Sequence, residues 1–135
     1  MPDSLARLMA WGLVAVHVGL GLWALVGFLE LALPEVPWTR LSNPLFSRPM
    51  LLLQWSLITL AAMVFIGGYA WRWRHTPVAM SVVYGAMALV CAYQTFFVLT
   101  HPTRFRAMAI EYAEYSSILA FLFLSSHMRE RFGAA

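Results

Sequence analysis

Four long apolar stretches make up nearly all of the 135-residue chain, and polar residues gather between them. The stretches cover residues 5–33, 49–71, 77–99 and 107–127. Each is close to the roughly 20 residues that an α-helix needs to cross about 30 Å of hydrocarbon. They lack the alternation of apolar and polar residues that membrane β-strands show. The pattern predicts an all-α integral membrane protein, a four-transmembrane-helix antiparallel bundle that forms a single domain over residues 1–135.

The composition also indicates a membrane protein. Hydrophobic residues account for 61% of the chain and charged residues for 11%, whereas about a quarter of the residues in a soluble domain are charged. Every basic residue is an arginine, and most arginines lie at the ends of the apolar stretches, where they mark the membrane surface. We therefore expect membrane lipids as partners, and no nucleic acid.

The arginines also predict an orientation. The side that holds both termini has slightly more of them, with Arg7, Arg72, Arg74, Arg129 and Arg131 against Arg40, Arg48, Arg104 and Arg106 on the other side. By the positive-inside rule, both termini are expected in the cytoplasm. The absence of lysine is typical of GC-rich bacterial genomes, so we expect the inner membrane of a bacterium.

The fourth stretch carries two carboxylates near its start, Glu111 and Glu114. A spacing of three residues places both on one helical face, which must meet protein or water because a charge facing lipid is costly. One interpretation gives them acid/base chemistry or the binding of a cationic group. The other pairs them with Arg104 or Arg106 at the membrane surface. Glu114 lies deeper and is the stronger catalytic candidate of the two.

A third acid, Glu30, lies one turn before Pro34 at the end of the first stretch. A carboxylate there opposes the helix dipole, so we do not expect it to stabilise the helix. It is predicted either to face a cavity beneath the proline-rich loop of residues 34–48, which would fold back as a lid, or to pair with Arg40 or Arg48.

His17 lies in the middle of the first stretch, among apolar residues. It is predicted to donate or accept a hydrogen bond across to Gln94, Tyr93 or Gln54, or else to relay a proton or contact a ligand. Several other polar side chains lie within the stretches and could help to bind an apolar ligand: Gln54, Tyr84, Gln94 and Tyr115.

Metal and haem sites are not expected. The four histidines include no pair at a ligand spacing such as i and i+4 on one helix. The single cysteine, Cys91, cannot form a disulfide within the chain. We therefore predict no cofactor.

A set of short motifs resembles the EXPERA family of membrane proteins, which includes the emopamil-binding sterol isomerase and the sigma-two receptor. The motifs are His17, Glu30, Leu33-Pro34, Asn43-Pro44-Leu45, Pro49 and Arg74-His75-Thr76-Pro77. The resemblance implies a four-helix core, cytoplasmic termini and a hydrophobic pocket gated by acids, with Asn43 near the ligand. This chain has Asn43 where the family has aspartate. The second helix of the family offers a carboxylate, whereas the second stretch of this chain offers only Gln54 and Thr59. An acid would therefore have to come from Glu30, Glu111 or Glu114.

Two function classes follow from these residues. In the first, the protein holds an apolar small molecule, similar to a sterol, isoprenoid or carotenoid, and acts as a binder or as an acid/base isomerase or cyclase. Its acid would be Glu114 or Glu30, and His17, Gln94 and Tyr115 would orient the ligand. In the second, the chain is an accessory transmembrane subunit of a larger membrane complex, for example a redox or photosynthetic one, or forms a homodimer.

Overall fold

The computed structural model describes residues 3–33 and 42–133, and within them all regular structure is helical. The elements are α1 (Asp3–Ala32), α2 (Arg48–Trp71), α3 (Thr76–Tyr93), a π-helical turn η1 (Gln94–Val98), α4 (Arg104–Leu124) and α5 (Ser126–Arg131). Four segments are long and apolar enough to span a membrane, with η1 extending α3 in the third. The predicted fold class, an all-α four-helix membrane protein, is confirmed.

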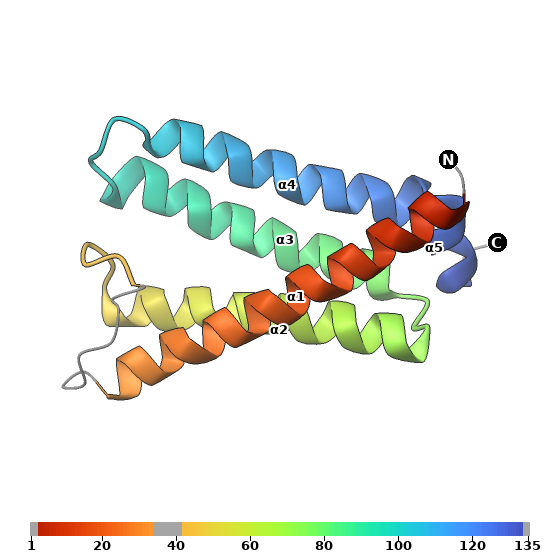
Figure 1. Cartoon of the computed structure of the whole chain (residues 1–135). Helices are drawn as coiled ribbons and strands as arrows, with labels where there is room; N and C mark the ends of the chain where they lie inside the picture. Colours follow the sequence, from red (N-terminus) through yellow and green to blue (C-terminus); the bar gives the residue numbers. More distant parts are fainter. Residues whose placement is uncertain (1–2, 34–41, 134–135) are drawn as a thin grey trace.

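Successive spans run in opposite directions, so both ends of the described chain lie at the same end of the molecule (Figure 1). Contacts join α1 to α2, α2 to α3 and α3 to α4, and α1 also touches α5. By contrast, α1 and α4 do not pack along each other. The bundle is therefore open on the side between these two helices.

Helix α1 crosses α2 obliquely (Figure 1). It contains 30 residues, about 45 Å at 1.5 Å per residue. This exceeds the roughly 30 Å of a hydrocarbon core, and tilting is the usual way to accommodate the excess.

The main core lies toward the end of the bundle that holds the termini. It brings together buried side chains from all four spans and from α5, among them Phe65, Tyr84, Leu122, Met128 and Phe132. Two glycines allow close packing in the bundle: a Cβ at Gly27 would overlap the Trp55 ring, and one at Gly68 would overlap Thr76.

The turn between α2 and α3 is short. Arg72 adopts the left-handed conformation, with φ 53°, and its N–H bonds back to the Gly68 carbonyl to close α2. Pro77 lies in the first turn of α3, where its missing N–H costs no helical hydrogen bond.

Two helix ends differ from the ranges expected from hydropathy. The third span closes in the π-helical turn η1, whose Leu99 N–H bonds to the Gln94 carbonyl at 2.8 Å. The fourth span runs from Arg104 to Leu124, earlier than residues 107–127, because extended Ser125 ends it. The short helix α5 then turns back and buries Met128 in the core.

Candidate functional site

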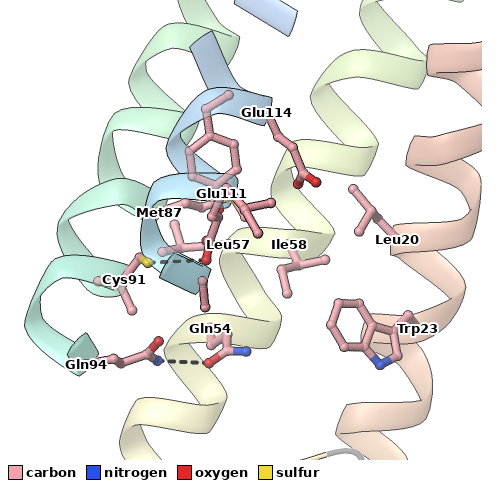
Figure 2. A pocket seen from close by; sticks show the side chains of 14 residues that line it. Leu20, Trp23, Gln54, Leu57, Ile58, Met87, Cys91, Gln94, Glu111 and Glu114 are labelled. Carbon is pink, nitrogen blue, oxygen red and sulfur yellow. Dashed lines mark hydrogen bonds between the residues drawn. The ribbon is translucent and has the colours of Figure 1, made fainter. Parts of the chain in front are cut away.

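A cavity of about 440 Å³ lies between α4 on one side and α1 and α2 on the other, with α3 and η1 completing its wall. We call it the lateral cavity. Its walls are mainly apolar and are formed by side chains that include Leu20, Trp23, Leu57, Ile58, Met87 and Ile110. Figure 2 shows Leu20 and Trp23 of α1 across this space from Glu114, whereas the Glu111 carboxylate is turned toward Cys91.

Glu114 lies at the midpoint of α4 and lines the lateral cavity. Its carboxylate points into the cavity toward α1 (Figure 2). Within the described part of the chain it makes no hydrogen bond or ion pair, and the Nε of Arg104, one of its expected partners, is itself without a hydrogen-bond partner.

Glu111 lines the same cavity one turn earlier on α4. One carboxylate oxygen accepts a hydrogen bond from the Tyr115 hydroxyl, and the other accepts one from the Cys91 thiol, with 3.2 Å between Sγ and Oε2. Glu111 is therefore held by α3 and α4. The structure brings Glu111 and Glu114 to one face, but the partners of Glu111 are not the arginines that the sequence suggested.

A further hydrogen bond joins α3 and α4 close to this site. The Tyr112 hydroxyl donates a hydrogen bond to the backbone carbonyl of Ala88, at 2.7 Å. Together with the bond from Cys91 to Glu111, it fixes the start of α4 against α3.

Two glutamines meet at another part of the lateral cavity. The amide Nε2 of Gln94 donates a hydrogen bond to Oε1 of Gln54 at 2.9 Å, joining η1 to α2 (Figure 2). Gln94 is the first residue of the π-helical turn. Such turns often occur at functional sites, because the extra residue redirects the side chains around it.

His17 is fully buried and lies outside the lining of the lateral cavity. Its Nδ1 is 2.7 Å from the Leu13 carbonyl, which can only accept, so Nδ1 carries the proton and Nε2 accepts a hydrogen bond from the Tyr84 hydroxyl at 2.8 Å. The predicted cross-helix bond therefore exists, but its partner is Tyr84 and not Gln94, Tyr93 or Gln54.

Tyr84 connects this buried pair to the cavity wall. Its ring stacks on the Tyr115 ring, with 4.8 Å between centroids and 14° between planes. Tyr115 in turn donates to Glu111. Polar and aromatic contacts thus run without interruption from His17 in α1 to Glu111 at the cavity.

Glu30 and Asn43 lie elsewhere, before the start of α2. One oxygen of Glu30 accepts hydrogen bonds from the Ser42 backbone N–H and hydroxyl, each at 3.1 Å. Asn43 forms a turn by accepting a bond from the Leu45 N–H at 3.0 Å. Neither residue lines the lateral cavity, so the structure does not bring Glu30 to the carboxylates of α4.

Part of the predicted lid cannot be placed. Residues 34–41, which include Pro34 and Arg40, lie outside the described part of the chain. The suggested pairing of Glu30 with Arg40 therefore also falls outside it.

Sequence reasoning missed the role of Cys91, which donates to Glu111, and of Leu20 and Trp23, which form the opposite wall. A signal existed for Cys91, since it precedes Gln94 by three residues and so shares its helical face. Leu20 and Trp23 carry no such signal. Among the described residues, no three His, Cys, Asp or Glu side chains come together as metal ligands would.

Comparisons of the chain with protein-family models, with curated proteins and with solved structures found no match.

Proposed function

We propose that the protein binds a largely apolar, lipid-like molecule in the lateral cavity, with a polar group of that molecule facing Glu114. The observation that carries the proposal is the carboxyl group of Glu114, which points into an apolar cavity at the midpoint of a membrane span without a partner in the described chain. An acid at that depth costs about 2.5–3.5 kcal/mol and usually marks a functional site. A bound molecule with a hydrogen-bond donor would offset this cost.

The size and lining of the cavity support a small apolar ligand. Its volume of about 440 Å³ falls within the roughly 300–1,000 Å³ that small-molecule sites occupy. Leu20, Ile58 and Met87 would contact the body of the ligand, while Gln54 and Gln94 offer a second polar contact. Sterol-like, isoprenoid and carotenoid-like molecules have this combination of a long apolar body and few polar groups.

The open side of the bundle supports access from the bilayer. Because α1 and α4 do not pack along each other, an apolar molecule dissolved in the membrane can reach the cavity between them. Such a route avoids moving the ligand through water.

The two carboxylates differ in what they can do for a bound molecule. Glu111 already accepts hydrogen bonds from Tyr115 and Cys91, which hold it in place. Glu114 is therefore the group available to exchange a proton with the ligand. In an isomerase, it would add a proton at one carbon of a double bond, which leaves a cation at the other carbon. Its carboxylate would then accept a proton from the next carbon beyond that cation, so that the double bond moves by one position.

The binding proposal is tested by native mass spectrometry of the protein extracted from its own membrane in a mild detergent. We expect wild-type protein to carry one discrete lipid-like mass. Glu114→Gln should reduce its occupancy at least tenfold, while Glu130→Gln, an exposed control on α5, should retain it. Equal occupancy in both variants would contradict the proposed contact with Glu114.

A steric pair of variants tests the location of the ligand. Leu20 lines the lateral cavity, whereas Leu22, on the same helix, is 60% exposed and lies outside the cavity. Leu20→Trp should fill the space and expel the bound mass, and Leu22→Trp should not. If both variants retain the mass, the ligand is not in this cavity.

The alternative role as an accessory subunit is favoured by one observation on α4. Within the described chain, Leu122 is the only residue of this 21-residue helix that is buried. Its exposed face includes Ala113 and the small polar residues Ser116 and Ser117, which suit close packing with another membrane helix.

This alternative predicts co-migration with other subunits in fixed stoichiometry after mild extraction. Ala113→Leu on α4 should then release the chain from the complex, while Ala70→Leu, at an exposed position on α2, should not. Migration as a single chain before any substitution would exclude the subunit role.

A further inference from the structure

A second hollow, separate from the lateral cavity, follows one side of α2 and ends at the turn to α3. It has a volume of about 810 Å³. Its apolar part is a stripe of α2 residues at helical spacing, which includes Leu60, Met63, Val64 and Gly67. From Leu60 to Trp71 this stripe is about 16 Å long, at 1.5 Å per residue. We call it the α2 groove.

The groove ends at two arginines and a histidine. Arg72, Arg74 and His75 line it, and none of the acidic side chains that the structure describes does. The membrane span of α2 ends at Ala70, so these residues lie at the membrane surface. Trp71 and Trp73 flank them at the depth where aromatic rings commonly settle.

The arginines of the groove remain available to a ligand. Arg74 donates from Nε to the His75 ring at 3.0 Å, which leaves its two terminal amino groups for other contacts. Arg131, at the same end of the molecule, is engaged differently: it donates to the Tyr69 carbonyl at 3.0 Å and lies over the Tyr69 ring. The groove therefore has its own uncompensated positive charge.

We propose that the α2 groove binds an anionic phospholipid. Arg72 and Arg74 would contact the phosphate, and one acyl chain would lie along α2 from Gly67 toward Leu60. The assignment rests on charge complementarity and on depth. The two arginines lie at the membrane surface, and the apolar part of the groove begins directly beside them, within the span. It is independent of the ligand in the lateral cavity.

The test measures lipid affinity of the purified full chain by native mass spectrometry. The probes are dioleoyl-phosphatidylglycerol and dioleoyl-phosphatidylcholine, which share their chains and differ in net charge. An arginine near the membrane surface contributes about fivefold in affinity for an anionic lipid. The double variant Arg72→Asn/Arg74→Gln should lose about twenty-five-fold in affinity for phosphatidylglycerol and less than twofold for phosphatidylcholine. Asparagine is chosen at position 72 because it tolerates the left-handed conformation.

The matched control is Arg104→Gln/Arg106→Gln at the start of α4, which should change the tightest phosphatidylglycerol affinity less than twofold. If the double variant at positions 72 and 74 loses helical content, Arg74→Gln alone should still lose about fivefold. Equal affinity of wild-type protein for the two lipids, or equal losses in variant and control, would overturn the proposal.

The acyl part of the site is tested separately. Gly67→Leu places a side chain in the groove and should weaken both lipids about tenfold, whereas Gly85→Leu, at a position on α3 with open space around it, should weaken neither. Inorganic phosphate at the same concentration should not displace phosphatidylglycerol. Displacement by phosphate, or full affinity in Gly67→Leu, would show that no acyl chain occupies the groove and would overturn the assignment.

Discussion

The Nε2 of His17 in α1 accepts a hydrogen bond from the Tyr84 hydroxyl in α3, at 2.8 Å, in the buried centre of the molecule. The pair does more than satisfy two polar groups at membrane depth. It joins α1 to α3, two helices that do not otherwise pack along each other. Leu20, one turn after His17, lines the lateral cavity.

A double-mutant cycle should measure this contact. Tyr84→Phe leaves His17 without its donor, and His17→Phe leaves Tyr84 without its acceptor. We expect a coupling energy of about 0.6 kcal/mol, and at most about 1.7 kcal/mol, in the free energy of unfolding, which are the mean and the maximum found for hydrogen bonds between membrane helices. Tyr93→Phe, at an exposed position on α3, serves as the control and should have little effect. Additive effects of the two core changes would show that the bond contributes nothing.

Tyr115→Phe should destabilise the protein by about 1.5–3 kcal/mol, because it removes a hydrogen bond to the Glu111 carboxylate. Thermal unfolding in detergent checks the loss. In a Glu111→Leu background the same change should cost much less, since the acceptor is already gone. The same loss in both backgrounds would mean that the Tyr115 hydroxyl does not stabilise the protein through Glu111.

Glycine substitutions should separate close helix contacts from open positions. Gly27→Ala and Gly68→Ala introduce a Cβ that overlaps Trp55 and Thr76, so each should cost about 1–3 kcal/mol in the free energy of unfolding. Gly12 and Gly19 have open space around them, and alanine there should gain about 0.5–1 kcal/mol through helix propensity. Thermal unfolding of the four variants is the measurement, and a uniform effect would contradict the packing.

Loss of the hydrogen bond between Gln54 and Gln94 in the lateral cavity should have a milder effect on stability. Gln94→Leu leaves Gln54 without its donor and should cost about 0.6–1.7 kcal/mol in the free energy of unfolding. The loss should vanish when Gln54→Leu is present, because no unpaired amide remains. Unfolding of the single and double variants checks this, and an undiminished loss in the double variant would assign the effect to the π-helical turn itself.

The number and position of the membrane spans could be predicted from the sequence, because length and hydropathy decide them. The shared face of Glu111 and Glu114 could be predicted as well, since a spacing of three residues fixes their relative direction. The break at Ser125 could not: it arises because the polar end of the chain turns back and buries Met128.

The hydrogen-bond partners of side chains on neighbouring helices could not be predicted from the sequence, for a geometric reason. Choosing between Tyr84 and Gln94 as the partner of His17 requires the rotation of α3 about its axis, which hydropathy does not fix in an apolar helix. The π-helical turn adds to the difficulty, because it changes the direction of residues from Gln94 onward. Glu30 bonds to Ser42, a residue nearby in the chain, and hydropathy does not indicate such a local contact.

The central claim is that the lateral cavity holds one specific apolar molecule. The most direct measurement introduces a photoreactive leucine analogue, which keeps the size of the native side chain, at position 20 or 22, irradiates native membranes and determines the mass attached to the protein. Position 20 lines the cavity and position 22 faces outward. We expect one discrete mass at position 20 and a mixture of bulk lipids at position 22. The same lipid mixture at both positions would contradict a specific ligand in the cavity.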